Sequence, residues 1–392
     1  MISVKEAKEK IAEKVGSLQP KVLALEHANG LVLAEPVLAK FDIPSFRQSS
    51  MDGYAFRFCD KKLPLEIQNK IAAGDSSSYS ISKKETARIF TGAALPENAD
   101  TVVMQEKVSV KDDKVLIHDE HLKEGDFVRQ IGSEIKAGQV ALEKGMILKP
   151  ASIGFLAATG INEVCVYPSP VVTVVITGNE LQPPGTELSF GKVYDSNSYS
   201  LSAALKNARI EKIKIAYAED KPEAVEDILK TALDESDLVL LTGGVSVGDY
   251  DFVVEAAENC GVTKHFHKIK QKPGKPLYFG TKDEKVIFGL PGNPGSVLTC
   301  YYEYVLLAIE KMANKATALQ KQKAILQNDY SKKAGLTHFL KGTYEEGKVK
   351  MLSPQASFQL RSFAIANCLI VVDEEAETLK EGDEVEVHLI PT

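Results

Sequence analysis

The sequence of 392 residues contains no tryptophan, only five cysteines and no long apolar run. No segment approaches the roughly 18 consecutive apolar residues that a membrane-spanning helix needs. The first residues, MISVKEAKEKIAEKVG, mix charged with apolar residues and lack the apolar core of a secretory signal. The cysteines are far apart and never form a CxxC pair, which argues against a disulfide scaffold and a zinc site. We therefore predict a protein of the reducing cytoplasm with no membrane partner.

A large excess of one charge is also absent. The chain has 54 acidic and 47 basic residues, a formal net charge of -7, and 44% of its residues are apolar. This balance is typical of soluble globular proteins, and the negative sign argues against a general nucleic-acid-binding surface. At about 100 to 200 residues per domain, the length predicts two to four domains.

The character of the sequence changes three times along the chain. An amphipathic helix comes first, because apolar residues recur at helical spacing between Val4 and Val15. Polar, turn-rich sequence with short alternating runs follows residue 42 and indicates a β-rich domain. From residue 166 apolar strands alternate with helices, and residues 320–392 alternate again, which indicates a small β-barrel or sandwich.

The block that begins at residue 166 predicts an α/β domain. Residues 171–176, 237–241 and 286–290 are apolar runs followed by glycine turns, whereas residues 201–208 and 222–233 have a helical pattern. Continuous apolar strands between helices of this length are typical of a parallel sheet that is covered on both faces. The ligand of such a sheet lies beyond the carboxyl ends of its strands, where the glycine turns are.

The strongest local motif is a glycine-rich loop, Thr242-Gly-Gly-Val-Ser-Val-Gly248, directly after an apolar strand. Its glycines and Ser246 can present backbone N–H groups and a hydroxyl to an oxyanion. The alternative is a tight strand-to-helix turn without a ligand, and the density of glycine favours anion binding. The loop is neither GxGxxG nor a Walker A motif, so it predicts neither a dinucleotide site nor a P-loop.

Residues 244–248 also match the GxSxG string of α/β-hydrolases. In a hydrolase, Ser246 would be the nucleophile on a strand-to-helix elbow. No HGGG-type oxyanion loop lies upstream, and the string stands inside a longer glycine loop. A hydrolase therefore remains a minor alternative.

Two further loops are suited to anions. Residues 264–275 hold five lysines and two histidines. A run of charge is usually a solvated surface, but the turn Pro273-Gly-Lys-Pro276 would fix lysines in place, so phosphate or oxyanion binding is slightly favoured. Residues 289–296 follow another apolar strand, and their N–H groups can hold an anion. Capping of the next helix alone would explain Ser296.

Carboxylates complement these loops. Glu180, Asp220, and the pair Asp249 and Asp251 follow three different predicted strands. Each of them alone is more simply a solvated acid. Together, at the edge that carries the anion-binding loops, they predict a Mg²⁺ ion that bridges carboxylates and phosphate oxygens. The histidines lack metal-ligand spacing, and the turn-rich stretch around Asp52 has no role that composition reveals.

These motifs, in this order, resemble the molybdopterin molybdenumtransferase family, which includes MoeA and the E domain of gephyrin. The resemblance covers nearly the whole chain, whereas GGVSVG alone would not identify the family, because molybdopterin adenylyltransferases and CinA-like proteins have similar loops. The matching stretches are Ser50-Met-Asp-Gly-Tyr-Ala55, Arg88-Ile-Phe-Thr-Gly-Ala93, Thr177-Gly-Asn-Glu-Leu181, Asp195-Ser-Asn197, Gly243-Gly-Val-Ser-Val-Gly248, Lys272-Pro-Gly-Lys-Pro276 and Leu290-Pro-Gly-Asn-Pro294.

The resemblance implies a homodimer with four domains in each subunit. Residues 1–41 and 140–165 would form a discontinuous helical linker domain, and residues 42–139 a β-rich inserted domain. Residues 166–317 would form the parallel-sheet, molybdopterin-binding α/β domain, and residues 318–392 a C-terminal β-barrel. The resemblance also implies a cleft between the α/β domain of one subunit and the β-rich domain of the other.

The implied reaction takes adenylylated molybdopterin and molybdate, with Mg²⁺, and yields molybdenum cofactor and AMP. The molybdopterin adenylyltransferase is the implied partner that delivers the substrate. The implied catalytic residues are Asp52, Thr91, Glu180, Asp220, Asp251, Lys268 and Lys272, of which Asp52, Glu180, Asp220 and Asp251 would place the Mg²⁺. The implied substrate-binding residues are Gly243, Gly244, Ser246, Gly248, Lys275, Pro291, Asn293, Pro294 and Ser296.

The resemblance also implies how these residues divide the work. The glycine loop and Ser296 would hold the phosphate end of the pterin, and the lysines would neutralise the pyrophosphate or the molybdate. Pro291 and Pro294 would shape the loop that faces the molybdate, and Thr91 would reach in from the partner subunit. Such a catalyst positions its substrates and neutralises charge, and it needs no covalent nucleophile.

The sequence departs from the family pattern at three places. Asn179 stands where the family usually has Asp, residues 132–135 are Gly-Ser-Glu-Ile where the pattern is Gly-Glu-Asp, and only Tyr250 separates the two aspartates after the glycine loop. Two other functions remain open: a molybdopterin-binding scaffold of the gephyrin type, and molybdopterin adenylyltransferase. The full set of acids and lysines argues against the scaffold, and the chain length argues against the adenylyltransferase, which is a single α/β domain.

Overall fold

The computed structural model describes residues 1–244 and 252–391. The chain divides into two compact units, of which unit 1 contains Met1–Val22, Gly30–Ala34 and Cys165–Thr392, and unit 2 contains Leu23–Asn29 and Glu35–Val164. The predicted site residues Ser246, Gly248 and Asp251 lie outside the described residues.

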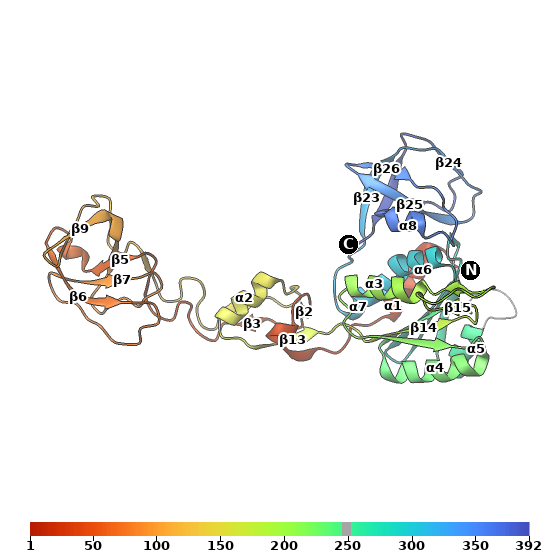
Figure 1. The fold of residues 1–392 in the computed structure, drawn as a ribbon, viewed down its shortest axis with the longest axis horizontal. Helices are drawn as coiled ribbons and strands as arrows, with labels where there is room; N and C mark the ends of the chain where they lie inside the picture. The colour runs from red at the N-terminus through yellow and green to blue at the C-terminus, as the bar shows by residue number, and fades with distance from the viewer. Residues whose placement is uncertain (245–251, 392) are drawn as a thin grey trace. The chain divides into compact units, whose positions relative to one another are not determined.

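A six-stranded sheet forms the centre of unit 1 (Figure 1). In the order β17-β14-β18-β22-β21-β19, the first four strands are parallel, which confirms the predicted parallel sheet. The last two strands are antiparallel to their neighbours, so the sheet is mixed. The strands are β14 (Val172–Thr177), β17 (Ile213–Ala218), β18 (Leu238–Thr242), β19 (Thr263–Lys268), β21 (Pro276–Lys282) and β22 (Lys285–Leu290).

Helices cover both faces of this sheet (Figure 1). On one face Val172, Val174 and Ile176 pack against α1, α3 and a continuous helical segment made of α6, η4 and α7. On the other face Val175 packs against α4 and α5. The helices are α1 (Val4–Lys14), α3 (Asn197–Asn207), α4 (Pro222–Glu235), α5 (Phe252–Asn259), α6 (Pro294–Cys300), the π-helix η4 (Tyr301–Val305) and α7 (Leu306–Met312).

Helix α1 belongs to this α/β part of the molecule. Its first turn is a capping box, in which the Glu6 N–H donates to the Ser3 hydroxyl and the Ser3 N–H donates to the Glu6 carboxylate. Its apolar face, with Ala7 and Ile11, joins the core under the sheet. The structure therefore groups the first residues with the α/β domain, whereas residues 1–41 are predicted to form a linker domain. An amphipathic pattern predicts a helix but does not identify the core that the helix joins.

Besides α1, the segments predicted as a helical linker contain one more α-helix, α2 (Pro150–Ala158), and several short strands. Strand β12 (Val140–Leu142) pairs with β3 (Val37–Leu38), and β13 (Glu163–Tyr167) lies between β1 (Lys21–Ala24) and β2 (Val32–Leu33). These pairings join the two sequence segments that are predicted to form one discontinuous domain. The exact domain boundaries remain a prediction.

Unit 2 holds the segment predicted to be β-rich, and its main sheet has the order β8-β5-β7-β6-β10-β9. Gly53 begins β5, and an added Cβ at this position would lie 1.8 Å from the carbonyl oxygen of Val103 in the neighbouring strand β8. Only glycine therefore fits at the position directly after Asp52. The short elements are β4 (Gln48–Ser49), β5 (Gly53–Phe56), β6 (Leu65–Ile71), β7 (Glu85–Ile89), β8 (Thr101–Met104), β9 (Val108–Lys111), β10 (Lys114–Ile117), β11 (Val128–Arg129) and the 3-10 helices η1 (Leu25–His27), η2 (Phe58–Asp60) and η3 (Gln105–Lys107).

The C-terminal block is a closed β-barrel, as predicted. The order β25-β26-β23-β29-β27 closes because β27 pairs back to β25. A short strand of the lysine-rich segment, β20 (Gln271–Lys272), extends the sheet by pairing in parallel with β25. The elements of this block are β23 (Gln320–Leu326), β24 (Tyr330–Ser331), β25 (Thr337–Glu345), β26 (Lys348–Met351), α8 (Arg361–Ile365), β27 (Cys368–Val372), β28 (Thr378–Leu379) and β29 (Glu384–Leu389). Two further short strands, β15 (Leu181–Gln182) and β16 (Val193–Tyr194), belong to the α/β part of the chain.

A buried chain of charges connects α1, η4 and the barrel. Lys8 Nζ lies 2.5 Å from one oxygen of Glu303, and His388 Nδ1 lies 2.7 Å from the other. His388 Nε2 lies 2.8 Å from Glu386 Oε1, so each ring nitrogen of His388 faces a carboxylate. Burial raises the pKa of Glu303, but Lys8 and His388 outweigh it and hold that pKa below its usual value.

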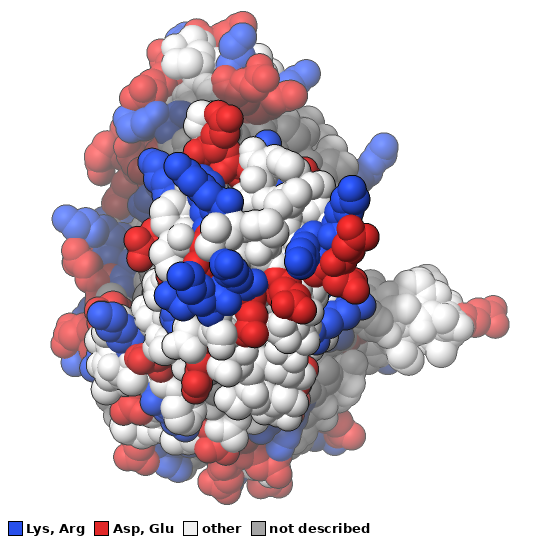
Figure 2. All heavy atoms as spheres, turned by 90° about the vertical axis from the view of Figure 1, so that its left-hand side faces the viewer, with Lys and Arg blue, Asp and Glu red and all other residues white. Residues whose placement is uncertain are grey.

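None of the helices in the described ranges is long and apolar enough to cross a bilayer. On the face shown in Figure 2, Lys and Arg side chains are interspersed with Asp and Glu, and neither sign forms a large continuous patch.

Candidate functional site

Three loops leave the parallel sheet side by side. In the strand register, Ile176 pairs with Thr242, and Thr242 pairs with Leu290, so the ends of β14, β18 and β22 are aligned. The segments that begin at Gly178, Gly243 and Pro291 therefore start at one edge. On the other side of β14, Thr177 pairs with Ala218 of β17, which brings the Glu219–Asp220 turn to the same edge. This is the edge at which the sequence predicts the ligand.

The start of the glycine loop packs directly on β14. Gly243 has a φ of +86°, and an added Cβ would lie 2.6 Å from both the carbonyl and hydroxyl oxygens of Thr177. The Thr177 hydroxyl in turn donates to the Thr242 carbonyl at 3.1 Å. Gly244 also has a positive φ, of +61°. Backbone conformation and close packing thus account for these two glycines without a ligand, whereas the rest of the loop lies outside the described residues.

The loop after β22 is held from two sides. The Asn197 side chain donates to the Gly292 carbonyl at 2.9 Å, and the Asn293 side chain donates to the Ser357 hydroxyl at 3.1 Å. The Gly295 N–H donates to the Ser357 carbonyl at 2.8 Å. A loop of the barrel therefore fixes the start of α6.

The sequence predicts that Ser296 either caps the next helix or helps to hold an anion. The structure corrects the first of these roles, because the Ser296 side chain does not cap α6. The helix begins at Pro294 with Asn293 at the N-cap position, and no side chain makes the cap hydrogen bond. Ser296 is buried, and its N–H and that of Val297 donate to the Asn293 carbonyl. Because these first-turn N–H groups are engaged, an anion here depends on side chains.

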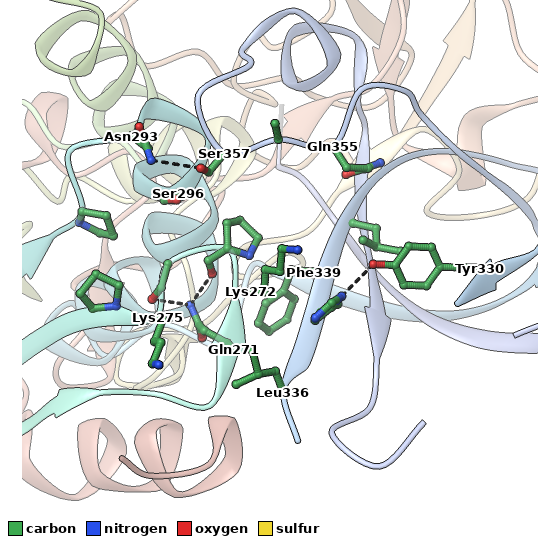
Figure 3. A pocket seen from close by; sticks show the side chains of 17 residues that line it. Gln271, Lys272, Lys275, Asn293, Ser296, Tyr330, Leu336, Phe339, Gln355 and Ser357 are labelled. Atoms are coloured by element: carbon green, nitrogen blue, oxygen red, sulfur yellow. Dashed lines mark hydrogen bonds between the residues drawn. The ribbon is translucent and has the colours of Figure 1, made fainter. Parts of the chain in front are cut away.

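A cavity of about 670 Å³ lies between the lysine-rich turn, the Pro291 loop and the barrel (Figure 3). This volume is in the range of small-molecule sites. Figure 3 shows Lys272 near Phe339, with Tyr330 on the barrel side and Asn293, Ser296 and Ser357 along another side. The predicted site residues that line the cavity are Lys272, Lys275, Pro291, Asn293 and Ser296.

The turn that carries the lysines is rigid, in agreement with the sequence pattern. The Gln271 side chain is fully buried and donates to the carbonyl oxygens of Pro273 and Gly274 at 3.0 and 3.1 Å. An added Cβ at Gly274, whose φ is +81°, would lie 2.5 Å from the Cys300 sulfur. Lys268 ends β19 opposite Pro276 and does not line the cavity, and neither does Pro294.

The barrel supplies cavity residues that sequence reasoning missed: Tyr330, His338, Gln355 and Ser357. They are single polar residues in alternating segments, and no pattern connects them to the lysine-rich turn. The pairing of β20 with β25 makes that connection. Behind them, the buried Lys341 ammonium donates to the Ala356 and Gln359 carbonyl oxygens at 3.3 and 3.2 Å and so orders the Gln355–Gln359 loop.

The predicted acids at the sheet edge lie on neighbouring turns. The Asn179 side-chain oxygen accepts a hydrogen bond from the Asp220 N–H at 3.4 Å, which links the turn that holds Glu180 to the turn that holds Asp220. In the described part of the chain, no three His, Cys, Asp or Glu side chains form a group that holds a metal ion. Mg²⁺ often uses only one or two carboxylates together with substrate phosphates, so Glu180 and Asp220 remain compatible with such an ion.

Asp52 and Thr91 lie together in unit 2. The Thr91 N–H and its hydroxyl both donate to Asp52 Oδ1, each at 2.8 Å. These two bonds, with a smaller contribution from Arg88, lower the pKa of Asp52 below its usual value. The carboxylate is exposed and ionised at neutral pH. Asp52 and Thr91, which come from two separate stretches that match the family pattern, are thus direct neighbours in the structure.

Three family profiles match successive parts of the chain. The MoeA N-terminal region (domain I and II) matches residues 2–160, a probable molybdopterin binding domain matches residues 173–311, and the MoeA C-terminal region (domain IV) matches residues 323–390. Together they cover most of the sequence in the order that the motifs predict.

Known proteins resemble the chain over its full length. A molybdopterin molybdenumtransferase from Haemophilus influenzae is 34% identical over 403 residues, which is 99% of this chain and 98% of that protein. A protein of the same name from a Nostoc species is 33% identical and covers 95% of this chain and 89% of its own length. The crystal structure of a molybdopterin biosynthesis MoeA protein from Pyrococcus horikoshii has a TM-score of 0.77 at 29% identity, covering 99% of this chain and 100% of its own.

These similarities confirm the predicted family, the multi-domain α/β architecture with a terminal barrel, and the predicted class of enzyme, a transferase of molybdenum cofactor biosynthesis. The order of the matched domains and the full-length coverage lead to one conclusion. The chain belongs to the MoeA family of molybdopterin molybdenumtransferases.

Proposed function

We propose that the protein inserts molybdate into adenylylated molybdopterin, with Mg²⁺, and releases AMP and molybdenum cofactor. The observation that carries the proposal is the placement of charge. A cavity lined by Lys272 and Lys275 adjoins the Pro291 loop, and that loop leaves the same sheet edge as the turns that hold Glu180 and Asp220. Cationic and anionic groups side by side suit a substrate with a phosphoanhydride and a bound cation.

In this proposal the chain acts by positioning. Lys272 and Lys275 hold the oxygens of the phosphoanhydride or of molybdate, and Lys268, at the end of β19, adds positive charge next to the same turn. Water adds at the phosphorus of the pterin phosphate, the P–O bond to AMP breaks, and AMP leaves with the bonding electron pair. The two thiol groups of the pterin then replace one oxygen of molybdate, which leaves as water with both thiol protons. Neutralising charge and aligning the two oxygens is the main requirement for this type of transfer, so no covalent nucleophile is needed.

Glu180 and Asp220 are the described residues that would hold the Mg²⁺ ion, and Asp52 and Asp251 are further proposed ligands. When bound, the ion neutralises phosphate oxygens and so favours departure of AMP. The link between the Asn179 side chain and the Asp220 backbone keeps the two acidic turns together.

We also propose a homodimer in which Asp52 and Thr91 of one subunit act at the α/β site of the other. Asp52 is suited to this role because it is exposed, ionised and oriented by two hydrogen bonds. An ionised carboxylate can accept a hydrogen bond from the attacking oxygen or bind the cation. A cytoplasmic location and delivery of the substrate by the molybdopterin adenylyltransferase complete the proposal.

The test is release of AMP by the purified protein from adenylylated molybdopterin in the presence of molybdate and Mg²⁺, measured by chromatography. We expect AMP to form, and Lys272→Ala to slow its formation by about 100-fold, as removal of one charged group from a transition state does. Lys348→Ala, an exposed lysine of β26 outside the cavity, is the control. Tight pterin binding without AMP would instead indicate a scaffold, and pyrophosphate release from ATP and molybdopterin would indicate the adenylyltransferase.

A further inference from the structure

The barrel side of the cavity holds a pair of polar rings. The Tyr330 hydroxyl and His338 Nδ1 are 2.7 Å apart, and both residues line the cavity. His338 is 7% exposed. In the pairing of β20 with β25, His338 lies directly opposite Lys272. A buried imidazole and the lysine of the rigid turn are therefore cross-strand neighbours at one wall of the cavity.

The hydrogen-bond partners determine which nitrogen of His338 is free. A neutral imidazole has one donor nitrogen and one acceptor nitrogen. Burial raises the pKa of Tyr330, so its hydroxyl keeps its proton and can donate to Nδ1. In the tautomer in which the Tyr330 hydroxyl donates to Nδ1, the ring proton is on Nε2, and within residues 1–244 and 252–391 no hydrogen bond to this atom is present. In this tautomer Nε2 is a donor without an acceptor among the described residues, on a side chain that lines the cavity.

The surroundings keep this ring neutral. Burial lowers the pKa of His338 to about 4, and the nearby Lys272 and Lys332 ammonium groups act in the same direction. At neutral pH the cavity therefore takes its positive charge from lysines, while His338 supplies a directional donor that adds no charge. Lysine is a flexible point charge, whereas a buried ring held by a second side chain has a fixed donor direction.

We propose that His338 binds a tetrahedral oxyanion through Nε2–H beside Lys272, and that Tyr330 is a positioning residue that fixes the proton on that nitrogen. The inference rests on the proposed function for the identity of the oxyanion, which is either free molybdate or the phosphate group of the adenylylated pterin. Both are tetrahedral groups with several negatively charged oxygens, and both suit one lysine and one neutral donor.

Two substitutions at one position separate donation from a purely structural role. In His338→Asn, the side-chain oxygen is placed near Nδ1, so it can still accept from Tyr330, but the Nε2 donor is lost. In His338→Gln, the longer amide places a donor near Nε2, but the bond to Tyr330 is lost. The proposal predicts that Asn weakens oxyanion binding by about tenfold, the contribution of one hydrogen bond to a charged group, and that Gln retains most of the affinity.

Binding of sodium molybdate and of inorganic phosphate to the full-length protein is measured by titration calorimetry, and thermal melting is recorded for each variant. Weaker binding of molybdate alone in the Asn variant assigns the metal oxyanion, weaker binding of phosphate alone assigns the phosphate group, and weaker binding of both assigns a shared site. His265→Asn is the matched control, because His265 is partly buried, contacts the Thr281 hydroxyl at 2.8 Å and does not line the cavity.

Three results would overturn the proposal. Either the Asn variant binds both anions as the wild type does, or the Gln variant loses as much affinity as the Asn variant, or the wild type binds neither anion at millimolar concentration. Because the readout is binding without turnover, these results are distinct from failure of the proposed function, which is failure of the wild type to release AMP.

Discussion

At the scale of single residues, Asp52 is the sharpest test of the site. It is an exposed loop carboxylate that is ionised and held by Thr91, so its loss removes charge from the proposed site and little from any core. We expect Asp52→Ala to reduce AMP release by about 100-fold or more while the free energy of unfolding stays close to that of the wild type. AMP release by chromatography and denaturant unfolding measure the two effects.

The control for this prediction is Asp75→Ala in the same unit. Asp75 also accepts hydrogen bonds within its own turn, from the Ser77 N–H at 2.9 Å and the Tyr79 hydroxyl at 2.9 Å, and these bonds lower its pKa. It therefore matches Asp52 in chemistry but not in proposed role, and its variant should keep full activity. A large loss of stability in Asp52→Ala, without an equal loss in Asp75→Ala, would make Asp52 structural.

Single residues also show why part of the site was predictable. Gly243 and Gly274 stood out because their positive φ and close packing forbid a side chain, and such positions are visible in a sequence as glycine-rich turns. His338 and Tyr330 did not stand out, because a lone polar residue in a β segment carries no positional signal. The sequence pattern thus identifies residues that shape the backbone better than residues that contribute one side chain.

At the scale of elements, helix α7 contains a buried acid whose charge is poorly compensated. One oxygen of Glu310 accepts from the Ala318 N–H at 2.5 Å, and in the described structure its other oxygen is buried without a hydrogen-bond partner. Burial raises the pKa of this carboxyl to about 7, against the smaller opposing effects of the Ala318 N–H and Lys315. The folded protein therefore binds this proton more tightly than the unfolded chain does.

This proton makes stability fall as pH rises, because ionisation in the folded state is costly between the usual pKa of 4.5 and the raised value of about 7. Relative to Glu310→Gln, the free energy of unfolding of the wild type should drop by about 2 to 3 kcal/mol between roughly pH 5 and 8. Urea unfolding across this range measures the difference. If the free energy of unfolding depends on pH in the same way in the wild type and in Glu310→Gln, the prediction is wrong. The control is Glu284→Gln, which replaces an exposed acid between β21 and β22.

The pairing of elements was harder to predict than their existence. The strands and helices of the α/β domain follow from apolar periodicity, since their cores are built from continuous apolar runs such as Val172–Thr177. The two antiparallel strands β19 and β21 and the parallel pair of β20 with β25 were not foreseen. Hydrogen bonding between strands distant in sequence depends on register, and register is set by the whole packed molecule.

At the scale of the whole molecule, the proposed homodimer has a direct test. In the proposed homodimer each site combines Lys272 of one subunit with Asp52 of the other. A mixed dimer of an Asp52→Ala subunit and a Lys272→Ala subunit therefore has one site with both residues intact and one site that lacks both. Random pairing would make half of the dimers mixed, so about a quarter of the wild-type AMP release should return when the two inactive variants are refolded together. A mixture of Asp52→Ala and Thr91→Ala, which affect the same side of the site, should stay inactive. No recovery in the first mixture would exclude action across subunits.

The overall architecture could be predicted because its motifs lie in a fixed order over almost the full sequence. What the sequence could not reveal is which segments share a compact unit. Helix α1 joins the α/β core through Ala7 and Ile11, although the chain then continues into unit 2 before it returns. Connections of this kind depend on contacts between distant segments, and local patterns do not record them.

The buried charges around Glu303 impose an order on synthesis of the protein. Lys8 lies 295 residues before Glu303, and His388 lies 85 residues after it. While the ribosome is still producing the barrel, Glu303 can pair with Lys8 but not yet with His388. The contact between η4 and the last barrel strand, β29, can therefore form only after the rest of the chain has been synthesised, so it strengthens the α/β domain only at that stage.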